Sequence, residues 1–292
     1  MMKAMVALSL GCLLFSLSAS RVTAGGLRLS QYSGPWAYGL EVIPPWADGG
    51  KLLVNLPEHM NGWPKYVDIL HHNDKEPKGH WQVSEDGKTA TLDVESPRTA
   101  GLFVKGTATA GSDRVLFSMR IINKTDAALA GVTPLYCFQY RHLTGFPQWI
   151  DNLKHTFVLI DGKAVALIDT PSESREARRK AAYVRGCPQH DTDAFPSAVG
   201  GLITEKELDA AMISVEALDG SRRILIAWTP GKSMLANAAI PCAHGDPYYG
   251  AIPAGEAREA KGVVWFTTKP VEEAMKELAK EGHGAPLAEW AK

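Results

Sequence analysis

The chain has 292 residues, and its 31 lysines and arginines nearly balance its 32 aspartates and glutamates, giving a formal net charge of −1. A chain with so little net charge has no electrostatic attraction for nucleic acid or an anionic membrane, so we expect neither as a partner. Hydrophobic residues make up 45% of the chain, and it contains 27 glycines and 18 prolines, which favours a loop-rich protein with a sizeable core.

The N-terminal segment is typical of an export signal. Lys3 is followed by an apolar run over residues 4–17 and then by small residues up to Ala24. These are the parts of a secretory signal peptide, and the apolar run is shorter than the roughly 20 residues of a membrane span. We therefore predict a signal peptide over residues 1–24, a single domain over residues 25–292, a secreted or periplasmic location, and no membrane association after cleavage.

Segments rich in β-forming residues then alternate with turn residues along the chain. Residues 114–122 carry apolar side chains at every second position, the period of a half-buried strand. Asp-Gly pairs at 161–162 and 219–220 each join two such segments, as in β-hairpins. The predicted strands are residues 89–94, 102–107, 114–122, 132–140, 155–160, 164–168, 211–218, 222–228 and 262–267.

Helical signals are scarce. A proline, a run of good helix formers and a following glycine predict one helix over about residues 270–281. Residues 61–79 and 187–201 have no regular pattern, and we expect them to form long loops. The chain is thus predicted to be mainly β, with one short C-terminal helix.

Three motifs resemble those of galactose mutarotase-like proteins. Residues 114–129 read RVLFSMRIINKTDAAL, residues 140–142 read YRH, and residues 252–256 read IPAGE before the last predicted strand. The resemblance covers about residues 80–268 and implies a large antiparallel two-sheet β-sandwich of the galactose mutarotase-like type. It also implies a carbohydrate partner, and the chain is similar to exported proteins of polysaccharide-degrading bacteria. Such motifs specify a fold more closely than an activity.

The stretch CAHGDPYYG at 242–250 is the densest group of functional residue types. Histidine titrates near neutral pH and serves as an acid, a base or a metal ligand, so we predict His244 to be catalytic. Asp246 would orient it or bind a sugar hydroxyl, and Tyr248 would contact the substrate. The stretch joins a short apolar segment to a loop rich in glycine and proline, so we expect its polar side chains to lie at a sheet end. The alternative is a structural turn in which Asp246 accepts hydrogen bonds from backbone amides.

A second polar group lies at His71-His72. Neighbouring residues on a strand point to opposite faces, so at most one of the two is expected in a given site. We predict His72 as a catalytic partner and His71 as a substrate-binding residue, with Trp63 and Trp81 stacking on a sugar ring. The alternative is a solvated polar loop.

Arg141 and His142 form a third candidate. A guanidinium group binds a carboxylate, such as that of a uronic acid, through paired hydrogen bonds. We predict Arg141 as the anion-binding residue and His142 as a further catalytic residue, with a surface ion pair as the alternative.

No cofactor is expected, although a divalent metal bound by His72, His80 and His244 is an alternative because imidazole nitrogen is a common ligand. Three cysteines follow the predicted signal peptide: Cys137, Cys187 and Cys242. An oxidising compartment permits one disulfide among them, and three buried thiols are the alternative.

These features favour a secreted carbohydrate-active enzyme that works by His/Asp acid–base chemistry, with uronate-bearing saccharides among the expected substrates. Lyase, epimerase and hydrolase activities stay open at this point. A non-catalytic saccharide-binding or envelope protein and a metal-dependent enzyme are the alternatives. Convergence of His72, His142 and His244 in one site would favour catalysis.

Overall fold

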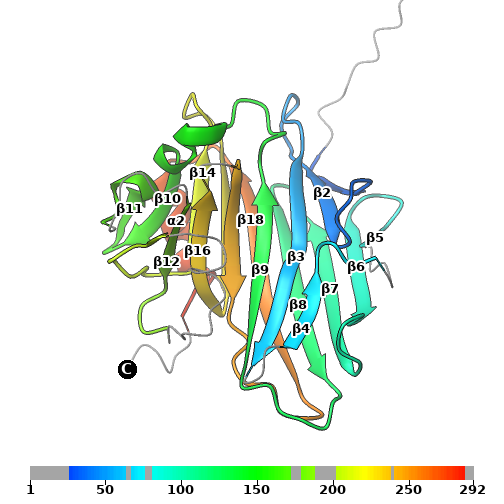
Figure 1. Cartoon of the computed structure of the whole chain (residues 1–292). Coiled ribbons are helices and arrows are strands. Elements are labelled where there is room, and N and C mark those ends of the chain that lie inside the picture. The colour runs from blue at the N-terminus through cyan, green and yellow to red at the C-terminus, as the bar shows by residue number, and fades with distance from the viewer. Residues whose placement is uncertain are drawn as a thin grey trace, which may run out of the picture.

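The structure is a computed structural model, and it describes residues 26–63, 67–75, 81–171, 179–187, 202–237 and 240–286. The predicted signal peptide at residues 1–24 and the predicted metal ligand His80 lie outside these ranges. Two large sheets pack face to face (Figure 1). This arrangement confirms the prediction of a mainly antiparallel two-sheet β-sandwich.

The first sheet has the order β1-β2-β3-β9-β17-β16-β12-β13, and β4 pairs with β3. Its neighbours are antiparallel except for the short parallel pair β12 and β13. Its strands are β1 (Arg28–Gln31), β2 (Gly39–Ile43), β3 (Leu52–Trp63), β4 (Val67–His71), β9 (Gly131–Gln139), β12 (Arg179–Tyr183), β13 (Leu202–Ile203), β16 (Gly231–Asn237) and β17 (Cys242–Pro247).

The second sheet has the order β11-β10-β14-β15-β18-β8-β7-β6-β5 and is antiparallel throughout the pairs described. Its strands are β5 (Gln82–Val83), β6 (Thr89–Glu95), β7 (Leu102–Ala110), β8 (Arg114–Asn123), β10 (Thr156–Ile160), β11 (Lys163–Ala166), β14 (Met212–Glu216), β15 (Arg223–Thr229) and β18 (Ala257–Thr267). Two short 3-10 helices span Trp149–Lys154 and Leu167–Asp169.

The core lies between the two sheets because each strand sends alternate side chains inward. In β8, the predicted apolar face is buried, and the ring of Phe117 lies 6.5 Å from that of Phe138 in the first sheet. Trp228 of β15 packs between Phe117 and Tyr136. These aromatic contacts hold the two inner faces together.

The predicted C-terminal helix is confirmed as α2 (Val271–Lys280). Its buried face, formed by Ala274, Met275 and Leu278, packs on the outer side of the second sheet against residues such as Met212 and Trp265. Among the described residues, no helix is long and apolar enough to cross a membrane.

The prediction of a long loop over residues 61–79 is wrong, because these residues include the end of β3 and the whole of β4. Residues 242–247, whose polar side chains were expected at a sheet end, form β17 in the middle of the first sheet. β17 is buried along its whole length, yet it contains Gly245, Asp246 and Pro247. These residue types are depleted in strands and common in turns, so the sequence does not favour a strand here.

Candidate functional site

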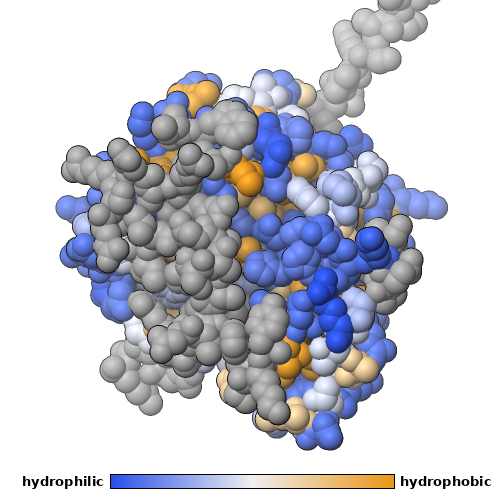
Figure 2. All heavy atoms as spheres, in the orientation of Figure 1, coloured by the Kyte–Doolittle hydropathy of each residue, from blue (hydrophilic) through white to orange (hydrophobic). Residues whose placement is uncertain are grey.

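The candidate site lies on the outer face of the first sheet, the face turned away from the second sheet. In β9, Tyr136 and Phe138 point into the core, where they meet Trp228 and aromatic residues of the second sheet. Alternation along the strand therefore places Cys137 and Gln139 on the outer face. Figure 1 views this face, and Figure 2 shows hydrophilic residues gathered on it over β3 and β4.

Strand β17 presents its polar side chains to the same outer face. A Cβ atom added at Gly245 would lie 2.7 Å from Trp228, so this position faces the core. Cys242, His244 and Asp246 therefore face outward. His244 is paired directly with Cys137 of β9, so cross-strand pairing brings together residues that are far apart in the sequence.

Cys137, Cys242 and His244 form a compact group that we call the thiol cluster. Their ligand-forming atoms all lie within 4.8 Å of one another, and Nε2 of His244 is 3.3 Å from Sγ of Cys242. All three side chains are buried, and Cys137 and Cys242 are not joined by a disulfide. Cys137 and Cys242 are therefore buried free thiols, which is the alternative to a disulfide that the sequence left open.

The thiol cluster shifts the pKa values of its members. Burial alone lowers the pKa of His244, but Cys242, Glu58 and Asp246 outweigh it and raise this pKa to about 9. The hydrogen bond with Cys137, together with His244, lowers the pKa of the Cys242 thiol. The same hydrogen bond and burial raise the pKa of Cys137. The cluster therefore favours a thiolate on Cys242 beside a charged imidazole.

Asp246 ties three strands together. Its Oδ1 accepts a hydrogen bond from the backbone N–H of Tyr136, and its Oδ2 accepts one from Ser233. Burial raises the pKa of Asp246 to about 7. Both carboxylate oxygens are thus engaged with β9 and β16, and no hydrogen bond to His244 is formed in the described part of the chain.

Glu58, His59, His71 and His72 form a second group, which we call the histidine cluster. All four side chains are partly exposed. The rings of His59 and His71 lie 6.1 Å apart, and those of His71 and His72 lie 4.3 Å apart. The expectation that the two adjacent histidines point to opposite faces is wrong, because His72 follows the end of β4 and lies in a turn.

The histidine cluster lowers the pKa of its imidazoles. Burial is the main cause of the fall in the pKa of His59 to about 4, and the neighbouring His71, His72 and His244 add to it against the opposing effect of Glu58. Burial and His72 also lower the pKa of His71. His59 is therefore neutral at physiological pH and has a nitrogen available to accept a proton.

Asp74 fixes the turn that carries His71 and His72. Its carboxylate accepts hydrogen bonds from the backbone N–H of His71 at 2.9 Å, from the Tyr38 hydroxyl at 2.7 Å and from Nε of Arg98 at 2.6 Å. An Asp that binds backbone amides after a strand is a common turn-forming element. The sequence therefore folds locally so that both histidines face β3.

Glu58 joins the two clusters. Its Oε2 lies 3.8 Å from Nδ1 of His244; its charge adds to the rise in the pKa of Cys137 and opposes the fall in the pKa of Cys242. The same charge opposes the fall in the pKa of His59. One carboxylate therefore acts on the buried thiols and on the more exposed histidines.

Several hydrogen-bond acceptors lie near the two clusters without a partner. Each is buried and accepts no hydrogen bond from the described residues; these atoms include Asn55 Oδ1, Glu58 Oε2, Asn61 Oδ1 and Gln139 Oε1. They belong to β3 and β9, the strands that carry His59 and Cys137. Unpaired buried acceptors are uncommon, and no donor for these four atoms lies among the described residues.

Other predicted site residues lie elsewhere. Trp81 is fully buried and donates a hydrogen bond from Nε1 to the Leu56 carbonyl, so the prediction that it stacks on a sugar is wrong. Trp63 ends β3, and its side chain is outside the described part of the structure.

Arg141 and His142 are exposed in the turn that follows β9. Burial lowers the pKa of His142, and Arg141 and Lys51 lower it further against the opposing effect of Glu41. His142 thus belongs to a separate charged surface around Lys51. Of the three histidines expected to converge, His72 and His244 both act on the pKa of His59, whereas His142 does not.

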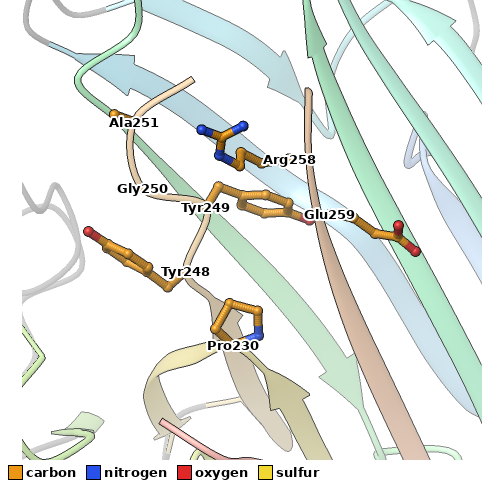
Figure 3. Close-up of a pocket in the computed structure, with 7 residues that line it drawn as sticks. All are labelled: Pro230, Tyr248, Tyr249, Gly250, Ala251, Arg258 and Glu259. Atoms are coloured by element: carbon orange, nitrogen blue, oxygen red, sulfur yellow. The ribbon is translucent and has the colours of Figure 1, made fainter. Parts of the chain in front are cut away.

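Tyr248 lines a separate pocket of about 470 Å³. Figure 3 shows this pocket, with Tyr248 and Arg258 on its wall. The adjacent Tyr249 points inward, where its hydroxyl bonds to the hydroxyl of Tyr136 and to the carbonyl of Met119. None of the histidine or thiol cluster residues lines this pocket.

The sequence alone did not identify Cys137, Glu58 or His59 as site residues. Only the pairing of strands brings these residues close to His244. In addition, β3 has a register shift between Asn55 and His59 that no sequence pattern predicts. The sequence gives no signal for Glu58 and His59, since no strand is predicted over residues 52–63.

Comparisons with known proteins give structural similarities only. No family model and no curated protein matches the chain. Similar solved structures include a galactose mutarotase-like protein from Clostridium acetobutylicum, with 9% identity, 84% of this chain and 99% of that chain covered, and a TM-score of 0.42. Another is a galactose mutarotase-like protein from Lactobacillus casei, with 10% identity, 82% and 100% coverage, and a TM-score of 0.40.

A polysaccharide lyase is also similar, with 11% identity, coverage of 87% of this chain and 34% of that chain, and a TM-score of 0.41. The structures that resemble this chain thus include galactose mutarotase-like proteins, the family named from its motifs. At this level the similarity is one of β-sandwich architecture, and it assigns no activity to the chain.

Proposed function

We propose that this protein is a carbohydrate-active enzyme in which the histidine cluster transfers protons, with His59 as the base. The observation that supports this role most strongly is the group of partly exposed imidazoles of His59, His71 and His72, whose rings lie 4.3–6.1 Å from their neighbours. A neutral imidazole within reach of solvent is able to take a proton from a bound substrate.

The cluster favours proton abstraction over hydrolysis. Glycoside hydrolysis ordinarily uses two carboxyl groups that face each other across the scissile bond. In the described part of the histidine cluster, Glu58 is the one carboxylate, and the nearby Asp68 and Asp74 are bound to Arg98. Lyase and epimerase reactions, which begin with proton removal, therefore fit these residues better.

A saccharide substrate is supported by a pair of aromatic rings beside the histidine cluster. Tyr32 and Trp36, stacked with ring centroids 5.0 Å apart, adjoin the histidine cluster through the bond from the Ala37 N–H to the His72 carbonyl. Aromatic rings of this kind provide flat apolar contacts for sugar rings.

The test is a panel of neutral and uronate-containing oligosaccharides and polysaccharides. Unsaturated-uronate absorbance reports a lyase, new reducing ends report chain cleavage, and NMR of the sugar protons reports an epimerase. We expect His59→Gln to lower the rate by about 10²- to 10⁴-fold, the usual contribution of a general base. His283→Gln is the matched control, since His283 lies in the turn after α2.

Three results would contradict the proposal. Full activity in His59→Gln would exclude His59 as the base. New reducing ends without unsaturated product would indicate hydrolysis. Binding of a saccharide without turnover would identify a non-catalytic saccharide-binding protein, the main alternative.

A further inference from the structure

The thiol cluster lies beneath the histidine cluster and has no part in the proton transfer proposed above. Two buried cysteines and a buried histidine meet there on the outer face of the first sheet. Free thiols are common in protein cores as small apolar groups. Two thiols that lie beside each other and beside an imidazole are not explained in this way. Thiolate and imidazole groups are the ligands that zinc and similar divalent metals prefer.

We propose that Cys137, Cys242 and His244 bind a divalent transition metal, with zinc as the best match. Strand geometry creates the site: Cys242 and His244 are two residues apart on one face of β17, and Cys137 is paired with His244 from β9. The three side chains therefore form a triangle held by backbone hydrogen bonds on two adjacent strands.

The distances suit such a site. Zinc binds thiolate sulfur at about 2.3 Å and imidazole nitrogen at about 2.0–2.1 Å, so tetrahedral ligands lie roughly 3.5–3.8 Å from one another. The His244 Nε2 to Cys242 Sγ distance is 3.3 Å, and all three ligand atoms lie within 4.8 Å of one another. Small side-chain rotations are enough to place all three around one ion.

Glu58 has the position of an outer partner to this site. A metal on Nε2 of His244 leaves Nδ1 for a carboxylate, and Glu58 Oε2 lies 3.8 Å from that nitrogen. A carboxylate that orients a ligating histidine is a recurrent element of metal sites. Asp246 is not a ligand, because its oxygens already accept hydrogen bonds from Tyr136 and Ser233.

Three zinc ligands come from the described residues, and tetrahedral zinc takes a fourth, either another side chain or a water. Mg²⁺ and Ca²⁺ prefer oxygen ligands and are not expected to bind.

The experiment measures metal content and the cobalt spectrum of the full-length protein without an affinity tag, kept reduced. After incubation with Zn²⁺ and dialysis, we expect one equivalent of zinc per chain. With Co²⁺, we expect thiolate-to-cobalt charge-transfer absorption and the visible bands of a tetrahedral ion. Zn²⁺ should also raise the unfolding temperature, whereas Mg²⁺ should not.

The variants separate ligands from bystanders. Cys137→Ser, Cys242→Ser and His244→Gln should each lose stoichiometric zinc. Cys187→Ser is the matched control, since Cys187 is buried in the core between the sheets and should leave zinc binding unchanged. Glu58→Gln should weaken zinc affinity by about 10- to 100-fold, as expected for an outer partner.

A folded, reduced wild-type protein without stoichiometric zinc would overturn the proposal, as would full zinc retention in Cys137→Ser or Cys242→Ser. A Cys137–Cys242 disulfide in the native protein, found by mass spectrometry, together with no zinc uptake after reduction, would identify a redox pair instead. If a ligand variant fails to fold, the cobalt spectrum of the wild-type protein still decides. Since none of these measurements uses a saccharide, failure here is distinct from failure of the proposed function.

Discussion

At the scale of single residues, the outer face of the first sheet holds imidazoles in two contrasting environments. Burial and neighbouring histidines lower the pKa of His59 to about 4. Burial also lowers the pKa of His244, but the effects of Cys242 and Glu58 are larger and raise this pKa to about 9. Groups whose pKa values are driven apart by their surroundings are typical of sites that handle protons or metals.

The lowered pKa of His59 predicts a pH dependence of stability. Unfolding returns this imidazole to a pKa of about 6.5, above its folded value of about 4. Between these two pH values the unfolded chain binds more protons, so the free energy of unfolding should fall as the pH falls. Glu58, His71, His72 and His244 are the titratable groups that act on His59.

The measurement is denaturant unfolding at a series of pH values for the wild type and His59→Gln. The variant should lose less stability between pH 6.5 and pH 4 than the wild type, while the difference between the two stays constant above about pH 7.5. Identical slopes for both proteins in the acidic window would show that His59 has an ordinary pKa.

At the scale of elements, the turn after β4 depends on one buried carboxylate. Asp74 is 3% exposed at its side chain and bonds to the backbone of His71, to Tyr38 and to Arg98. The turn has no other side chain that could replace these bonds in the described structure. The placement of the histidine cluster is therefore a property of the whole β4 turn.

Asp74→Asn should destabilise the fold by about 2 kcal/mol, because it removes the charge-assisted hydrogen bonds from Arg98, from the Tyr38 hydroxyl and from the His71 backbone. It should also lower saccharide turnover, since His71 and His72 lose their fixed positions. Asp93→Asn is the matched control: Asp93 pairs with Lys105 at an exposed site, where such a pair contributes about 0–1 kcal/mol. Equal losses in the two variants, measured by denaturant unfolding, would contradict this role of Asp74.

At the scale of the whole molecule, close contact between the sheets depends on glycines opposite a large aromatic ring. Trp228 is 1% exposed and lies between the two sheets. A Cβ atom added at Gly262 would lie 2.8 Å from atoms of its ring, and one added at Gly245 would lie 2.7 Å away. Since a buried ring has no free space to move into, these positions accept no larger side chain without strain.

Gly262→Ala should therefore cost about 1–3 kcal/mol in the free energy of unfolding. Gly131→Ala is the control, because nothing lies within 4 Å of a Cβ atom at that position. The double variant Gly262→Ala/Trp228→Phe should lose less free energy of unfolding than the sum of the losses in the two single variants. The reason is that the smaller phenylalanine ring leaves room for the added methyl group. Simple additivity in a double-mutant cycle would show that the strain does not come from Trp228.

The sequence by itself determined the fold class and much of the second sheet. The period-2 pattern of residues 114–122 and the Asp-Gly turns predicted β8 and the hairpins at 161–162 and 219–220, because short-range alternation and turn chemistry are local properties. The helix α2 was predicted for the same reason, from its proline, its apolar face and its following glycine.

Only the tertiary structure decided which side chains meet. His244 and His72 were candidates from residue type, but Cys137 and His59 became part of the site through the pairing of β9 with β17 and of β3 with β4. Trp81 was expected at the surface and lies in the core. Pairing between distant strands depends on how the whole chain buries its apolar surface, and a central strand such as β17 carries no local pattern that reveals its neighbours.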